Sequence, residues 1–267
     1  MSAALDLTTD SLVLREAPAP GVVRLTLNRP KAYNSLSSDL MRQLQDELDM
    51  IRDDASVHVV IIAASGPGFC AGHDLKEVRA LPDRKAMEKL FKQCSTLMQA
   101  IVALPKPVIA QVHGIATAAG CQLVASCDLA VAADTARFGT PGVNIGLFCS
   151  TPMVALSRNV GRKQAMEMLL TGDMVPAQRA VEIGLINRAV AEAELAAATL
   201  ALAQQVASKS PLTLKIGKEA FYRQLELPLA QAYDYASQVM TENLLARDAA
   251  EGIDAFIQKR TPCWEGR

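Results

Sequence analysis

The sequence predicts an α/β fold: a core built around parallel strands, followed by a helical C-terminal region. Apolar runs of strand length occupy residues 57–64, 108–112 and 129–133, all in the first half of the chain. Continuous apolar strands of this kind are typical of parallel sheets covered on both faces. Helical patterns dominate from about residue 153 to 257. We therefore expect a core over residues 1–195 and a helical region over residues 196–267.

The elements follow one another as strand, helix and strand. Residues 22–27 alternate in polarity before the turn pair Arg29-Pro30, which predicts a first strand. Ser37 or Ser38 can cap a helix whose apolar stripe is made of four residues, namely Leu40, Leu44, Leu48 and Ile51. The buried strand at residues 57–64 comes next, and a short strand over residues 185–190 closes the core.

Composition excludes several classes of protein. The 267 residues carry 27 Lys plus Arg and 28 Asp plus Glu without a basic block, so a nucleic-acid partner is not expected. The six cysteines form no C-x-x-C pair, which predicts a reduced protein without a metal site. No apolar run is long enough to cross a membrane, and residues 1–21 resemble no targeting signal, so we expect a cytoplasmic location and no membrane partner.

Two strands run into loops of small residues. The segment SGPGFCAGHDLKEV follows residues 57–64, and HGIATAAGCQLVAS follows residues 108–112. Loops of this kind leave backbone N–H groups unobstructed, and two of them could stabilise one thioester oxyanion. Alternatively, the small residues serve only tight turns and helix packing. The glycine spacing fits neither a dinucleotide fingerprint nor a P-loop, and no G-x-S-x-G is present.

With these loops, the sequence resembles the crotonase superfamily of enoyl-CoA hydratases and isomerases from about residue 11 to 264. The motifs that carry the resemblance occur in order: LNRPKAYNSL, FCAGHDLKEV, KPVIAQVHGIATAAGCQLVASCDLAVA, FGTPGVNIG, GRKQAMEMLLTG and AFIQKRTPCW. The resemblance implies a ββα-spiral core with a C-terminal helical trimerisation region. It also implies a coenzyme A thioester as substrate or ligand, no permanently bound cofactor, and a homotrimer or homohexamer.

By the same resemblance, the backbone amides of His73 and Ala119 would bind the thioester oxygen. Ala119 stands where most members of the family have glycine, so the loop must keep a negative φ there or accept strain. The His73 imidazole could act as a weak acid or base, or it could turn away from the carbonyl.

The resemblance also assigns residues to coenzyme A. Lys31 and Ala32 would approach its phosphates, and Ala71 and Leu75 would line the adenine pocket. Lys259 from the terminal helix would complete this pocket, in the same or a neighbouring subunit. The alternative for both lysines is solvated surface.

Two positions depart from the family pattern. Gln122 and Gly142 stand where hydratases carry the two glutamates that move protons on and off water, and neither can replace a general base. Gln122 could orient substrate or simply bond to the backbone. Cys149 could be a nucleophile, but a buried structural thiol is the alternative we favour.

These observations lead to three functional hypotheses. The first is an acyl-CoA-binding enzyme of the enoyl-CoA hydratase/isomerase family, with hydratase activity weak or absent. The second is a non-catalytic acyl-CoA-binding or regulatory protein. The third is a thioester decarboxylase or hydrolase, for which stabilisation of an enolate or oxyanion supplies much of the catalysis.

Overall fold

The computed structural model describes residues 11–267 and is built on a six-stranded sheet with the order β1-β2-β3-β4-β6-β9. A smaller sheet has the order β5-β7-β8. In chain order, the strands are β1 (Val13–Ala19), β2 (Val22–Leu27), β3 (Val59–Ala64), β4 (Val108–Val112), β5 (Ile115–Thr117), β6 (Leu129–Ala133), β7 (Arg137–Gly139), β8 (Val175–Pro176) and β9 (Arg188–Val190).

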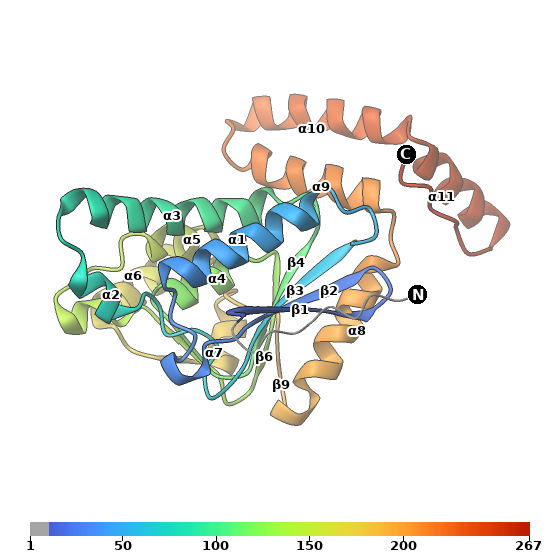
Figure 1. Ribbon diagram of the computed structural model, residues 1–267. Coiled ribbons are helices and arrows are strands. Elements are labelled where there is room, and N and C mark those ends of the chain that lie inside the picture. Colours follow the sequence, from blue (N-terminus) through green and yellow to red (C-terminus); the bar gives the residue numbers. More distant parts are fainter. Residues whose placement is uncertain (1–10) are drawn as a thin grey trace.

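Helices surround these strands and form the whole of the C-terminal region (Figure 1). The α-helices are α1 (Ser38–Arg52), α2 (Leu75–Ala80), α3 (Arg84–Ala103), α4 (Ala119–Ser126), α5 (Pro152–Asn159), α6 (Arg162–Thr171), α7 (Ala177–Glu182), α8 (Leu195–Ala207), α9 (Pro211–Gln224), α10 (Leu229–Leu244) and α11 (Arg247–Gln258). Three 3₁₀ turns accompany them: η1 (Pro30–Ala32), η2 (Pro141–Ile145) and η3 (Glu192–Glu194).

The large sheet is parallel except at one edge. β1 and β2 form an antiparallel hairpin that turns at Gly21, whose φ is +72°. β2 then pairs in parallel with β3, β3 with β4, β4 with β6, and β6 with β9. Each parallel pair needs a crossover, and α1 and α3 supply the first two. The loops that follow β3 and β4 therefore emerge at the same edge of the sheet, where the site is built.

The core lies on both faces of this sheet. Ser37 caps α1 by accepting a hydrogen bond from the Leu40 amide, and the apolar stripe of α1 is fully buried, as predicted. On the opposite face, Leu195, Leu202 and Ala203 of α8 pack against the strands. The division at residue 195 remains a prediction, and the packing of α8 favours a helical region that begins with α9.

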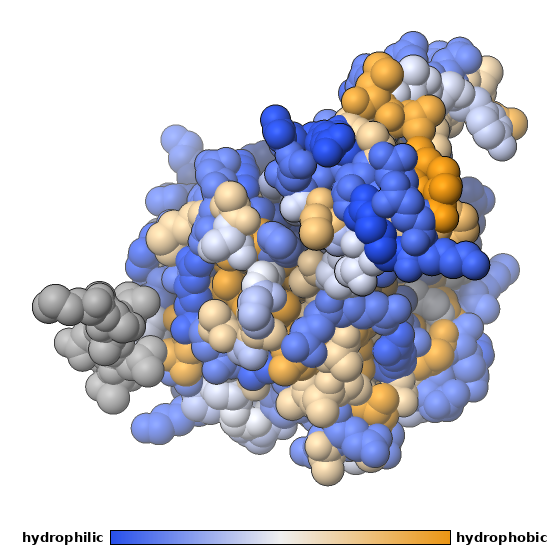
Figure 2. All heavy atoms as spheres, turned by 90° about the vertical axis from the view of Figure 1, so that its right-hand side faces the viewer, coloured by the Kyte–Doolittle hydropathy of each residue, from blue (hydrophilic) through white to orange (hydrophobic). Residues whose placement is uncertain are grey.

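The helices α9 to α11 project from the core (Figure 1). Their surface carries many exposed large apolar side chains, and hydrophobic residues gather on the projecting part at the upper right of Figure 2. The most exposed of them are Phe221, Leu225, Leu229, Tyr233, Met240, Leu244, Leu245, Phe256 and Ile257.

The predicted α/β class with a helical C-terminal region is confirmed. The strands at residues 22–27, 108–112 and 129–133 have the expected bounds. The small sheet was missed because its strands are only two or three residues long, too short for a period to be visible. Residues 1–10, part of the segment used to judge targeting, lie outside the described residues.

Candidate active site

An apolar cavity of about 390 Å³ opens where the two small-residue loops meet. Its walls come from the loop after β3, α2, the start of α4, the first half of α3 and residues 141–152. Hydrophobic side chains supply most of this lining, with Leu75, Val78, Phe91, Ile145, Leu147 and Phe148 among them. None of the described residues lining the cavity carries a carboxylate. Such a cavity suits an apolar chain better than a charged metabolite.

The two loops touch at the start of α4. A Cβ placed on Gly72, whose φ is +90°, would lie 3.4 Å from the Ala119 nitrogen. A Cβ on Gly120 would overlap the carbonyl oxygen of Cys70. Glycine at both positions is therefore required for the loops to approach, which favours the close-packing role proposed for these small residues without excluding a second role.

Two backbone amides are left unpaired at this contact. Within residues 11–267, neither the amide of His73 nor that of Ala119 donates a hydrogen bond to another residue. Ala119 is the first residue of α4, where a helix offers free N–H groups and a partial positive charge. Of the two alternatives predicted for Ala119, the negative φ is the one found. The strained backbone lies one residue earlier, at Ala118, with φ +49° and ψ −117°.

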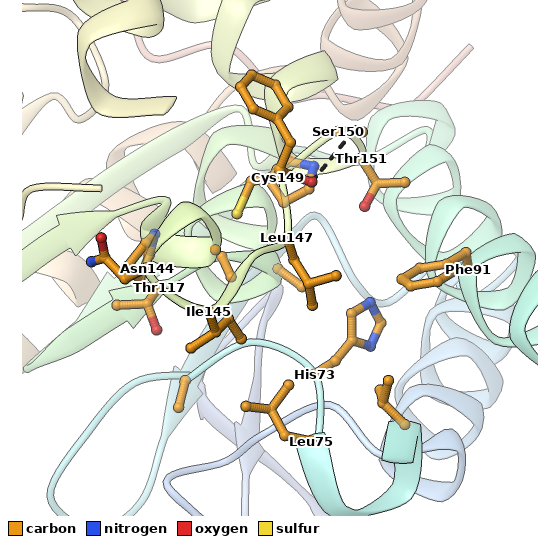
Figure 3. A pocket seen from close by; sticks show the side chains of 18 residues that line it. His73, Leu75, Phe91, Thr117, Asn144, Ile145, Leu147, Cys149, Ser150 and Thr151 are labelled. Atoms are coloured by element: carbon orange, nitrogen blue, oxygen red, sulfur yellow. Dashed lines mark hydrogen bonds between the residues drawn. The ribbon is translucent and has the colours of Figure 1, made fainter. Parts of the chain in front are cut away.

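The His73 side chain forms part of the cavity wall. Its ring lies between Leu147 and Phe91 (Figure 3) and meets Phe91 edge-on, with ring centroids 5.5 Å apart. Both ring nitrogens are buried without a hydrogen-bond partner among the described residues. Burial lowers the pKa of the imidazole, against smaller opposing effects of the Leu36 backbone and the Glu77 carboxylate. The ring is therefore neutral at neutral pH, with one donor and one acceptor to offer.

Gly142 lies where the loop over residues 141–152 closes on itself. A Cβ at this position would overlap the carbonyl oxygen of Leu147 and lie 2.8 Å from the Cys149 sulfur. Cys149 is buried in the cavity wall, and burial raises the pKa of its thiol. The thiolate is thus disfavoured, which agrees with a structural rather than a nucleophilic role.

Gln122 does not line this cavity. It is 5 % exposed and borders a second cavity, which residues of α3, α4, α5 and α9 line. Gln122 and Gly142, the two positions where the resemblance predicts the hydratase glutamates, therefore border different cavities.

Two nearby carboxylates are engaged elsewhere. Asp74 caps α2 and pairs with Arg29 at 2.7 Å, which lowers the pKa of this carboxyl. Glu77 accepts hydrogen bonds from the amide and hydroxyl of Ser38. Both act in the capping and anchoring roles that such residues usually have.

Comparison with known proteins identifies the family. The model of the enoyl-CoA hydratase/isomerase family matches residues 18–267. The chain belongs to the enoyl-CoA hydratase/isomerase family. It is 49 % identical to human enoyl-CoA hydratase domain-containing protein 3, mitochondrial, over 91 % of this chain and 80 % of that protein.

Solved structures of family members share the fold. The enoyl-CoA hydratase of Mycobacterium smegmatis superposes with a TM-score of 0.93 at 52 % identity, covering 96 % of this chain and 99 % of that one. Human enoyl-CoA hydratase domain-containing protein 3 superposes with a TM-score of 0.92 at 47 % identity, covering 95 % of this chain and 100 % of that one. The crotonase fold that the loop motifs implied is confirmed.

The predicted cytoplasmic location is contradicted. Relatives from human, mouse and zebrafish, 46–49 % identical to this chain, are named as mitochondrial. The prediction relied on residues 1–21 and on composition. The composition of a folded domain does not indicate the compartment in which the protein is located. Among residues 11–267, no helix is both long and apolar enough to span a membrane.

The structure places the coenzyme A residues of the family pattern in three locations. Ala71 and Leu75 line the cavity mouth. Lys31 and Ala32 lie on η1, which is tied to Ala71 because the Ala71 amide donates to the neighbouring Tyr33 carbonyl at 3.0 Å. Lys259 caps the end of α11, and in Figure 1 this helix lies at the opposite end of the molecule from α2, whose Leu75 lines the cavity. A role for Lys259 at this family site therefore requires a neighbouring subunit.

Several cavity residues were missed from the sequence. Ile145, Leu147 and Phe148 are exposed apolar side chains on one loop, and Phe91 reaches the cavity from α3. The run NIGLF has no helical or strand period, so periodicity gave no signal. The available signal was the cluster of large apolar residues around Gly146 in a segment that forms no strand.

Proposed function

We propose that this chain binds acyl-CoA thioesters in the apolar cavity and stabilises negative charge on the thioester oxygen with the amides of His73 and Ala119. The acyl group would lie among the apolar side chains, and coenzyme A would leave past Ala71 and Leu75. Family membership supports the thioester as the ligand.

One observation carries this proposal: the His73 and Ala119 amides, which donate no hydrogen bond within residues 11–267, belong to two loops that touch beside an apolar cavity. Backbone donors aimed at a developing oxyanion in a water-poor site can each be worth about 3 kcal/mol. A Cβ placed on Gly72 would lie 3.4 Å from the Ala119 nitrogen, and this close approach supports convergence of the two loops on one oxygen atom.

We further propose that this chain does not hydrate enoyl-CoA at the rates of family hydratases. Gln122 cannot accept a proton, and Gly142 has no side chain. Loss of one general acid or base typically lowers a rate by about 10²–10⁴. The closed loop around Gly142 also leaves no room for a glutamate there.

The neutral His73 imidazole makes no hydrogen bond of standard geometry within residues 11–267, and this favours an enzyme over a passive binder. It is a titratable group in the cavity wall, adjacent to the amide that would hold the carbonyl. A base in that position suits proton removal next to a stabilised enolate or activation of water for thioester hydrolysis.

Calorimetric binding of two matched ligands tests the oxyanion contact. Butyryl-CoA should bind at least about tenfold more tightly than its thioether analogue, in which a methylene replaces the carbonyl, because two hydrogen bonds are lost. Equal affinities would exclude a contact between the amides and the thioester oxygen.

A further inference from the structure

Basic side chains are concentrated on α2 and the first half of α3. Residues 75–92 contain six Lys and Arg but three Asp and Glu, in a chain whose net charge is −1. All six basic side chains are exposed. Arg84 is paired with Glu88 at 2.7 Å, and no ion pair within residues 11–267 involves the other five, which are Lys76, Arg79, Lys85, Lys89 and Lys92.

The other two carboxylates of this segment do not compensate the charge. Glu77 accepts hydrogen bonds from Ser38, and Asp83 caps α3 by accepting a hydrogen bond from the Ala86 amide. Residues 75–92 therefore present uncompensated positive charge to the solvent.

Three of the lysines share the outer face of α3. Lys85, Lys89 and Lys92 follow the spacing i, i+4 and i+7, on the side of the helix opposite its buried residues. Met87 and Phe91, also four residues apart, lie on a flank of the same helix, and Phe91 lines the apolar cavity. The outer face of this helix is thus basic, while the flank towards the cavity is apolar.

Large apolar side chains are exposed around the cavity mouth. They come from α2, α3 and the loop that follows η2, and Figure 3 shows four of them around the His73 ring. Each is between 40 and 58 % exposed, and all but Met87 line the cavity. Together with the five unpaired basic residues they form what we call the mouth patch: Leu75, Met87, Phe91, Ile145, Leu147 and Phe148.

This combination of charge and apolar surface matches a bilayer that contains anionic lipids. Apolar side chains enter such a bilayer beneath the headgroups, and lysines bind the headgroup phosphates. A helix is about 10 Å across, and charges act over about 8–10 Å at physiological salt, so the outer face of α3 stays within range while its flank inserts. An acidic protein surface would satisfy the charges alone.

We propose that the mouth patch docks this protein on the surface of an anionic phospholipid membrane. In Figure 1, α2 and the start of α3 lie at the end of the molecule opposite α10 and α11, so docking leaves the apolar surface of the helical region free. We expected no membrane partner because no apolar run can cross a bilayer, but a peripheral surface built from separate elements needs no such run.

The inference goes beyond the proposed function and gives it a source of ligand. Each methylene group of an acyl chain favours the bilayer over water about fourfold, so long-chain thioesters reside largely in membranes. A cavity that opens at the membrane surface would receive such a chain without its passage through water.

Vesicle sedimentation tests the charged part of the mouth patch. The wild type should bind vesicles of phosphatidylcholine with about 30 % phosphatidylserine at least about tenfold more tightly than vesicles of phosphatidylcholine alone. The variant Lys85→Glu, Lys89→Glu, Lys92→Glu should lose this preference. Its matched control, Lys163→Glu, Lys209→Glu, Lys215→Glu, reverses three exposed charges elsewhere and should keep it. No preference in the wild type, or an equal loss in both variants, would overturn the proposal. Thermal unfolding confirms that both variants are folded.

Met87→Ser tests the apolar part, because Met87 is exposed but lies outside the lining of the cavity. It should weaken binding to the anionic vesicles at least about threefold, whereas Met50→Ser, at an exposed position of α1, should not. Equal binding by these two variants would refute insertion of the apolar rim. Butyryl-CoA calorimetry keeps the two proposals separate: failure of the wild type to bind butyryl-CoA would overturn the proposed function, and vesicle sedimentation decides the docking without any thioester.

Discussion

At the residue scale, the proposal of weak hydration depends in part on Gly142, where one substitution cannot supply a usable carboxylate. The position lacks a carboxylate, and the loop has also closed over the space where one would stand. The sequence showed the missing side chain but not the closed loop, because loop conformation depends on contacts that no local pattern encodes.

Gly142→Ala is therefore expected to destabilise the protein. The added methyl group overlaps the Leu147 carbonyl, and such overpacking costs about 1–3 kcal/mol of unfolding free energy. The measurement is urea denaturation. Gly217→Ala is the control: nothing lies within 4 Å of its Cβ position in α9, so a gain of about 0.5–1 kcal/mol is expected. Unchanged stability of Gly142→Ala would show that the loop opens freely.

His73 makes stability depend on pH. Its pKa is lowered by burial in the folded chain, so the unfolded chain binds more protons once the pH falls below about 6.5. The contribution of His73 is present above that pH and is lost as the pH falls through it. Between about pH 7.5 and pH 5.5, the wild type should lose more unfolding free energy than His73→Leu, as measured by urea titration at each pH. Equal losses would mean that the folded imidazole titrates normally.

At the element scale, the sequence predicted the strands and α1 well because their signals are local. Ser37 caps α1, and the apolar run at residues 57–64 gave β3 with a shift of two residues at its start. The positions of α8 and α9 in the fold were not predictable from the hydrophobic periodicity of the sequence alone. They depend on distant partners: Lys218 of α9 contacts Asp128, and Leu195 of α8 contacts the sheet.

Lys218 is the anchor of α9. Its ammonium group donates to the carbonyls of Ile101 and Lys106 and pairs with Asp128 at 2.7 Å, with 6 % of the side chain exposed. Lys218→Met leaves the Asp128 carboxylate without its cation and should lower the unfolding free energy by about 3–5 kcal/mol. Lys215→Met, at an exposed position of the same helix, should change it by less than about 0.5 kcal/mol. Denaturant unfolding with a similar midpoint for the two variants would contradict this role.

At the scale of the whole molecule, α9 to α11 expose more apolar surface than a monomer usually leaves in water. The resemblance implied a trimer or a pair of trimers, and this surface supports assembly through the helical region. The sequence alone showed amphipathic helices but not which of their faces the core leaves uncovered.

Assembly is expected to fail when that surface becomes charged. Leu245 and Phe256 are 83 % and 85 % exposed, so a Leu245→Glu, Phe256→Glu double variant should fold and sediment as a single chain. The wild type should sediment as a trimer or hexamer. Leu170→Glu, 60 % exposed on α6 outside the helical region, should sediment like the wild type. A wild type that sediments as a monomer would exclude assembly through these helices.

We propose a thioester site that binds its ligand but lacks the groups for hydration. The most direct measurement is the hydration rate of crotonyl-CoA at a concentration that calorimetry shows to saturate the chain. The expected result is saturable binding with hydration at least about 10²-fold slower than in a family hydratase that carries both glutamates. Hydration at the rate of such a hydratase would contradict the claim.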